Sequence, residues 1–308
     1  MKQPINILLQ TTIPPTEDDW HIGRFSLLTS YLSSLQDEAG QPLYTVVARD
    51  RHCDRHNAAD GNDPVLSTLD QSDFDQLWLF AVDVGDGLTN VESEAINKFR
   101  QQGGGLLVTR DHQDLGCSIC SLEDVGAAHF FQTKNPDPDS SRHCIDDPYT
   151  TNISWPNYHS GKNGDCQKIT PLAPIHEILC NPHAASGAIE LLPSHPHEGA
   201  VGVPLGSQSS KNCRVVALGI SQVTGRQFNL MVAFERGSVG AGRAIAESTF
   251  HHFCDYNWDA QMGCPSFVDE LPGNTMQTNP SALSDLKLYL RNLAEWLAPD
   301  QQTPRSPS

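Results

Sequence analysis

Residues 77–112 decide the fold of this chain, and they read LWLFAVDVGDGLTNVESEAINKFRQQGGGLLVTRDH. The apolar runs at 77–82 and 106–109 are short and bounded by polar residues, which predicts buried strands. Between them, Thr89 followed three residues later by Glu92 is typical of a helix start, and three consecutive glycines end that helix. Strand, helix and strand in succession predict an α/β fold, with a mostly parallel sheet and helices on both faces.

The same alternation extends in both directions along the chain. We expect the first strand at 5–9, a helix at 25–32 and the second strand at 44–48. The strands at 5–9, 77–82 and 106–109 should be central neighbours in the sheet. Further expected elements are strands at 189–192, 215–218, 231–234 and 243–246, and an amphipathic helix at 281–298 with Leu286, Leu290, Leu293 and Leu297 near one face.

The regular pattern is lost between residues 131 and 182, which are rich in Pro, Asp, Asn, Ser and Gly. A stretch of this length without regular structure is uncommon in a compact domain unless it is functional or disordered. We interpret it as an irregular insertion that could cover the functional site. The prediction is therefore a single domain over residues 1–298, followed by a disordered tail at 299–308.

The composition argues against several classes of protein. The formal net charge is −17 without a block of like charges, and a diffuse negative field repels phosphate backbones, so we expect no nucleic-acid partner. No apolar stretch reaches membrane-spanning length and the first ten residues show no signal peptide, which predicts no membrane partner and a cytoplasmic location. Nine scattered cysteines, an odd number, indicate a reducing compartment, and we expect no disulfide between Cys117 and Cys120.

The strand ends indicate where a ligand would bind, because open parallel sheets bind ligands outside the carboxyl ends of their strands. The strand at 77–82 ends at Asp83, and the strand at 106–109 leads into Arg110, Asp111 and His112. A side chain at such a turn lies near helix N-terminal N–H groups, which favour anions. A purely structural alternative is that Asp111 caps a helix and His112 packs beside it.

Two later segments are polar and rich in histidine. His195 and His197 are two residues apart, so on an extended segment both face the same side, with Glu198 adjacent. This pattern suits a first-row divalent metal, although H-x-H also occurs by chance. Ser248 precedes His251 and His252, and adjacent helical residues do not share a face, so only one of that pair is expected to join a site.

These segments together resemble a known family. The runs at 103–116, 195–199, 242–243, 248–252 and 19–28 resemble an uncharacterised bacterial group of the class I glutamine-amidotransferase-like superfamily, near the trehalose-utilisation (ThuA-like) proteins. The resemblance implies a flavodoxin-like sheet with its site at the fourth-strand turn, and it adds Arg24 to the pocket. True amidotransferases carry a nucleophilic cysteine at that turn. Here Arg110, Asp111 and His112 occupy it, and Cys117 lies more than a helical turn beyond, so glutaminase chemistry is not expected.

The leading hypothesis is a hydrolase acting on a small polar molecule, with Asp111, His112 and Glu198 as catalytic residues. In its sharper form the site holds a divalent metal, zinc or similar, that activates water. The expected ligands are His112, His195, His197, Glu198 and His252, and the other expected pocket residues are Arg24, Asp83, Arg110, Ser248 and His251. The alternatives are a non-catalytic small-molecule-binding or scaffold domain that lost the nucleophile, and a cysteine enzyme using Cys117.

Overall fold

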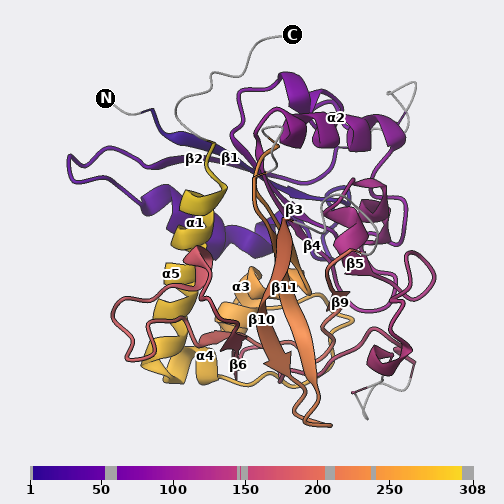
Figure 1. Cartoon of the computed structure of the whole chain (residues 1–308), viewed down its shortest axis with the longest axis vertical. Coiled ribbons are helices and arrows are strands. Elements are labelled where there is room, and N and C mark those ends of the chain that lie inside the picture. Colours follow the sequence, from indigo (N-terminus) through magenta and orange to yellow (C-terminus); the bar gives the residue numbers. More distant parts are fainter. Residues whose placement is uncertain are drawn as a thin grey trace.

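The computed structural model describes residues 3–52, 61–143, 146, 152–204, 212–236 and 241–299. Its centre is an eight-stranded sheet (Figure 1). In spatial order the strands are β2 (Tyr44–Arg49), β1 (Ile5–Thr11), β3 (Gln76–Phe80), β4 (Gly105–Thr109), β12 (Ala244–Glu247), β11 (Gln227–Phe234), β10 (Cys213–Ile220) and β7 (Thr170–Pro171).

The first five strands of this order are all parallel to one another, from β2 to β12. The remaining neighbours, from β12 through β11 and β10 to β7, pair antiparallel. The predicted mostly parallel α/β sheet is therefore confirmed. The predicted central neighbours are confirmed as well, since β1 pairs with β3 and β3 with β4.

Helices cover both faces of the sheet (Figure 1). Successive side chains of a strand point to opposite faces, so Leu8 packs on the side of α2 (Asn90–Gln101), whereas Ile7 and Leu9 pack on the side of α1 (Ser26–Ser34) and α5 (Pro280–Leu297). The short helices α3 (Asp255–Trp258) and α4 (Thr275–Thr278) contribute to the same core as α5. The capping box predicted from Thr89 and Glu92 is present at the start of α2.

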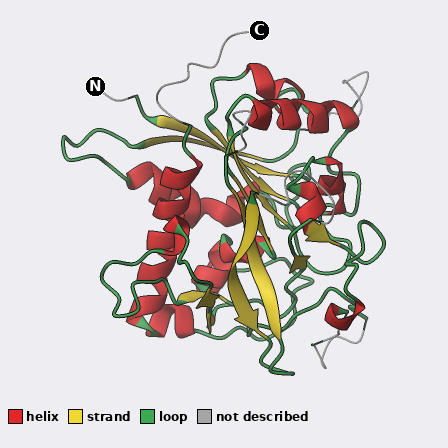
Figure 2. Ribbon diagram, in the orientation of Figure 1, coloured by secondary structure: helices red, strands yellow, loops and turns green. Residues whose placement is uncertain are grey.

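Long connections surround the carboxyl ends of the central strands (Figure 2). Two small sheets lie among them, β5 (His129–Phe130) with β9 (Ala200–Val201), and β6 (Cys166–Lys168) with β8 (Leu191–Pro193). The described part of 131–182 is irregular apart from β6, β7 and 3₁₀ helices at Ser140–Arg142 and Glu177–Leu179. Residues 300–308 of the expected tail lie outside the described residues, and the domain limits stay a prediction.

The described cysteines are all free thiols, so the prediction that Cys117 and Cys120 are not bonded is confirmed. Cys53 and Cys144 lie outside the described residues. The helix that carries the pair is a 3₁₀ helix, Cys117–Ser121, which begins later than expected because residues 112–116 form turns. Among the described helices, none combines the length and the apolar character that a membrane span requires.

Candidate metal centre

Two turns at the carboxyl edge of the sheet meet because β4 and β12 are parallel neighbours. β4 leads directly into Arg110, Asp111 and His112, and β12 leads into a 3₁₀ helix at Phe250–His252. The backbone N–H of Phe250 donates to the carbonyl of Arg110 at 2.9 Å, which fixes one turn against the other. Thr249 caps the 3₁₀ helix by accepting from the N–H of His251.

The segment that carries His195 and His197 is held beside these turns by the irregular insertion. Tyr158 and Glu198 exchange backbone hydrogen bonds of 2.9 and 2.8 Å, and the Ser160 hydroxyl accepts from the N–H of His195. Gly199 then passes so close to the β4 turn that a Cβ would lie 2.6 Å from the carbonyl oxygen of Asp111. A side chain at that position would push the two segments apart.

These turns open onto a cavity of about 680 Å³. Its walls come from the β4 and Phe250–His252 turns, the His195 segment, the insertion, and two loops near residues 19 and 267–270. The lining residues are Asp19, Trp20, Val82, Val84, Asp111, His112, Gln113, Leu115, Asn152, Ile153, Asn163, His195, His197, Phe250, His251, Phe267, Val268, Asp269 and Glu270.

Asp111, His195 and His251 form a tight, buried cluster at this cavity. The Nε2 atom of His195 lies 3.2 Å from Oδ1 of Asp111, and the Nε2 atom of His251 lies 3.7 Å from Oδ2. The two imidazole rings are stacked, with centroids 3.5 Å apart and planes 10° from parallel. One ligand atom from each of the three residues lies within 4.8 Å of the other two.

Two asparagines behind the rings determine which imidazole nitrogen carries the proton. The carbonyl of Ser194 can only accept, so the amino group of Asn257 faces it, at 2.9 Å. The Oδ1 atom of Asn257 then accepts from Nδ1–H of His251 at 2.9 Å. The same amino group donates to Oδ1 of Asn163, which also accepts from Nδ1–H of His195 at 2.8 Å. Each ring therefore turns Nε2 toward Asp111.

In this cluster, Nε2 of His195 and Oδ1 of Asp111 face each other at 3.2 Å. Oδ1 of Asp111 and Nε2 of His195 are buried and have no hydrogen-bond partner of suitable geometry. Burial, together with the neighbouring His251, holds the pKa of His195 well below its usual value, so its ring is neutral. Burial raises the pKa of Asp111, but the opposing effect of His112 and His195 is larger. The pKa of this carboxyl group therefore lies well below its ordinary value. An anionic carboxylate facing the lone pair of a neutral imidazole is an arrangement that a cation would complete.

His112 and His197 line the same cavity without joining the cluster. Nδ1 of His112 lies 3.4 Å from Oδ1 of Asp111, and its ring meets that of His197 edge-on at 5.4 Å between centroids. Both nitrogens of His197 are engaged, Nδ1 by Asn157 at 3.0 Å and Nε2 by Glu270 at 2.9 Å. His197 is therefore a wall residue in this structure, in contrast to the ligand role expected for it.

Glu198 and His252 lie in a separate buried network, which corrects their expected role as metal ligands. Glu198 accepts from Ser160 at 2.5 Å, from Gln167 at 2.6 Å and from Ser248 at 2.6 Å. His252 lies between Glu247, 2.7 Å from Nδ1, and Glu198, 3.9 Å from Nε2. Burial lowers the pKa of His252, but the nearby carboxylate of Glu198 and the hydrogen-bonded carboxylate of Glu247 raise it to about 10. A protonated imidazole cannot coordinate a metal.

The other residues expected in the pocket do not line the cavity, His251 excepted. Arg24 donates to the carbonyls of Asp19 and Gly263, and Asp83 accepts from Gly85 and Ser118. Arg110 is fully buried and donates to the carbonyls of Asp111, Gln113, Phe130 and Ala200, so it ties loops together. Ser248 belongs to the Glu198 network.

Cys117, the alternative nucleophile, also lies outside the cavity lining. Burial and the carboxylates of Asp83 and Asp114 raise the pKa of its thiol. A raised pKa keeps the thiol protonated and therefore weakly nucleophilic.

Sequence reasoning missed the supporting residues of the cluster. Asn157 and Asn163 belong to the insertion, Asn257 to α3 and Glu270 to the loop that precedes α4. None of them lies in a periodic or motif-like pattern, so the sequence carries no signal that singles them out. Trp20, whose ring meets that of His251 edge-on at 4.7 Å, was included only through the family resemblance.

No protein-family model matches the chain, and no curated protein matches it. Among solved structures, a cytoplasmic protein of Salmonella typhimurium is similar at 10% identity and a TM-score of 0.47, over 96% of this chain and 99% of that one. A putative ThuA-like protein of Parabacteroides merdae is similar at 14% identity and a TM-score of 0.42, over 98% and 94%. The CTPS glutaminase domain of Trypanosoma brucei, with bound acivicin, is similar at 11% identity and a TM-score of 0.42, over 99% and 97%. Likeness at such identities concerns the overall fold alone.

Proposed function

We propose that the chain is a metal-dependent hydrolase of a small polar molecule, with Asp111, His195 and His251 as the ligands of a divalent ion. The observation that carries the proposal is that Nε2 atoms of two buried imidazoles lie beside one buried carboxylate. Asn163 and Asn257 hold Nδ1–H of the two rings, which leaves Nε2 as the only coordinating atom. Orientation of ligand histidines by a second hydrogen bond is the usual construction of a metal site.

The spacing of the three side chains fits such an ion. Ligand bonds to zinc of about 2.0–2.2 Å at a tetrahedral angle place neighbouring ligand atoms about 3.4 Å apart. Nε2 of His195 lies 3.2 Å from Oδ1 of Asp111, and Nε2 of His251 lies 3.7 Å from Oδ2. The two stacked rings would have to rotate apart for both to direct Nε2 at one ion. Two imidazoles and one carboxylate leave a coordination position for water or substrate, as catalytic zinc sites do.

The residues around the cluster provide the rest of a hydrolytic site. A bound divalent ion would polarise a carbonyl group and lower the pKa of a water molecule. His112, whose Nδ1 lies 3.4 Å from Asp111, is placed to accept or donate the proton that hydrolysis transfers. The Glu198 network lies behind the site and positions His195 through Ser160.

Two experiments test the proposal, first a measurement of metal content and then an assay of hydrolysis. Protein reconstituted with zinc should retain a stoichiometric amount after dialysis, and His195→Ala and His251→Ala should abolish retention. His197→Ala is the matched control, because this histidine lines the same cavity with both nitrogens already engaged. Retention of zinc by both ligand variants would overturn the assignment.

A panel of small esters and amides, with and without a chelator, then tests the chemistry. Chelator-sensitive hydrolysis that His112→Ala lowers by about a hundredfold is the expected result, in the range of general acid–base contributions. Metal retention without hydrolysis of any member would favour a binding domain instead of a hydrolase.

A further inference from the structure

The cavity at the proposed metal centre is one-sided in charge. Asp19, Asp111, Asp269 and Glu270 line it, and its lining, all of it within the described residues, includes no lysine or arginine. The remaining polar groups of its wall are histidines and amides. Two arginines lie close to lining residues without lining the cavity: Arg24 donates to the carbonyls of Asp19 and Gly263, and Arg110 donates to loop carbonyls.

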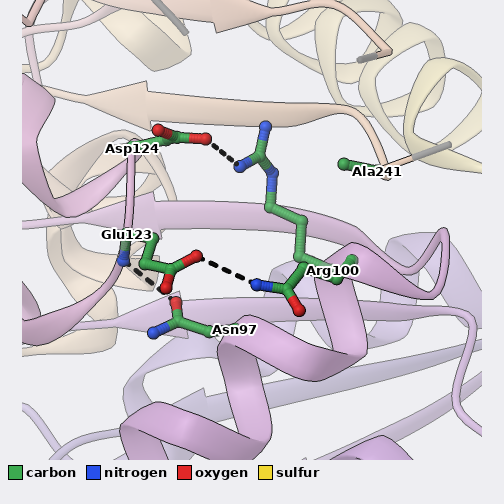
Figure 3. Close-up of a pocket in the computed structure, with 6 residues that line it drawn as sticks. Asn97, Arg100, Glu123, Asp124 and Ala241 are labelled. Carbon is green, nitrogen blue, oxygen red and sulfur yellow. Dashed lines mark hydrogen bonds and ion pairs between the residues drawn. The ribbon is translucent and has the colours of Figure 1, made fainter. Parts of the chain in front are cut away.

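A second cavity of the same molecule differs in that its lining includes an arginine beside two carboxylates (Figure 3). It measures about 390 Å³ and lies beside α2. In this cavity Arg100 forms an ion pair with Asp124 at 3.1 Å. The other carboxylate, Glu123, accepts a hydrogen bond from Gln101 at 3.0 Å. The lack of a cation in the first cavity is therefore a property of that cavity and not of the whole acidic surface.

A divalent ion at the cluster does not remove the negative excess. One of its two charges is balanced by Asp111, and the other is outnumbered by the three remaining carboxylates. Glu270 is hydrogen-bonded to His197, whereas Asp269 is exposed beside it and Asp19 is half-buried on another loop of the cavity wall. Phe267, which also lines the cavity and is exposed, adds an aromatic face that attracts cations, whereas the ring of Trp20 already has the guanidinium of Arg24 at 6.0 Å.

We propose that the substrate of this site carries a positive charge, as an ammonium or guanidinium group, on the part that does not react. Asp19, Asp269 and Glu270 select for that charge, and an anionic substrate is repelled because it meets like charges without a compensating cation. The net charge of −17 acts in the same direction. The inference rests on the proposed function for the reacting end of the substrate, and on the cavity alone for the charged end.

Three hydroxamates with the same metal-binding head group test the charge preference in zinc-loaded protein. They are β-alanine hydroxamate, which is cationic, 3-hydroxypropanohydroxamate, which is neutral, and succinate monohydroxamate, which is anionic. Calorimetry at low ionic strength should give Kd values that rise in this order, by about tenfold at each step, and the differences should shrink as salt is added. Equal affinities, or tighter binding of the anion, would overturn the proposal.

A double variant and a matched control locate the effect. Asp269→Asn with Glu270→Gln keeps shape and the acceptor toward His197, and it should reduce the preference to less than about threefold. Glu94→Gln with Glu123→Gln removes two exposed carboxylates elsewhere and changes the net charge equally. This control should retain the full preference. A control that loses as much as the cavity variant would assign the effect to overall charge and refute selection by these residues.

Metal-free protein separates this inference from the proposed function. Propylammonium, propanol and propionate carry the same three charges without a metal-binding head group, and ligand-detected NMR reports their binding. A preference for the cation in protein that retains no zinc would uphold the charge selection while refuting the metal centre. Absence of the preference with and without zinc refutes the charge selection.

Discussion

His251 and His252 are consecutive residues of one short helix, yet they belong to two buried clusters of opposite character. His251 lies beside Asp111 and His195, in a cluster where Oδ1 of Asp111 and Nε2 of His195 are buried without partners. His252 faces Glu247 and Glu198, where a cationic ring lies between two carboxylates. His197 and Glu198 are divided in the same way, one lining the cavity and the other turned into the buried network.

The difference distinguishes a cluster that stabilises the fold from one that is arranged for a ligand. In the Glu198–His252–Glu247 network, each carboxylate accepts hydrogen bonds and the cationic ring lies between them, although Oε1 of Gln167 has no partner. In the Asp111–His195–His251 cluster, by contrast, the buried Oδ1 of Asp111 and Nε2 of His195 face each other without a hydrogen-bond partner. Buried polar atoms without partners are rare in folded proteins and mark a place where something is missing.

The largest effect should come from breaking the Glu198–His252–Glu247 network. Glu247→Gln keeps the shape of the side chain but removes one of the two charges that hold the His252 imidazolium. We expect the free energy of unfolding to fall by about 3 kcal/mol or more, because the buried cation loses the carboxylate bonded to it at 2.7 Å and keeps only Glu198, 3.9 Å away. Urea unfolding measures the change. A loss of less than about 1 kcal/mol, comparable to one ordinary hydrogen bond, would contradict a charged network.

The fold and the general place of the site were predictable because they depend on local patterns. The apolar runs at 77–82 and 106–109 and the Thr89 capping box specify strands and a helix by themselves, and parallel neighbours bring their carboxyl ends to one edge. Asp111 and His195 were accordingly singled out before the structure was known. The pairing of β12 with β4 was not predictable, since it joins segments separated by the antiparallel β10 and β11.

The exact membership of the cluster was not predictable, because it depends on side-chain direction and on distant partners. The sequence indicated that only one of His251 and His252 could join the site, but the helix register that selects His251 comes from the packing of Phe250 against the β4 turn. The H-x-H spacing does place His195 and His197 at one cavity. Both rings have Nδ1 bonded to an asparagine of the insertion, and they differ at Nε2, which faces Asp111 in His195 and Glu270 in His197.

An effect of intermediate size is expected on zinc affinity when these two asparagines are replaced in turn. Asn163→Leu removes the acceptor that fixes the ring of His195, and we expect zinc affinity to fall by about 10- to 100-fold. Asn157→Leu makes the same chemical change behind His197, which is not a ligand, and should leave zinc affinity within about threefold of the native value. Competition with a chromophoric chelator measures both. Equal losses in the two variants would indicate that His197 is a ligand as well.

The smallest effect, and the one that best separates the two clusters, concerns Asp111 in metal-free protein. Asp111→Asn removes a buried negative charge and supplies an amide N–H that can donate to the bare Nε2 of His195, 3.2 Å away. We expect the free energy of unfolding to rise by about 1 kcal/mol, the net value of a hydrogen bond. Removing a carboxylate from the Glu198–His252–Glu247 network has the opposite sign, as argued for Glu247. Urea unfolding with a chelator present measures the gain, and a repeat with zinc supplies the control, because zinc should stabilise the native chain and not the variant. Destabilisation of the metal-free variant would mean that Asp111 is already satisfied in the protein, and the reason for placing a cation there would disappear.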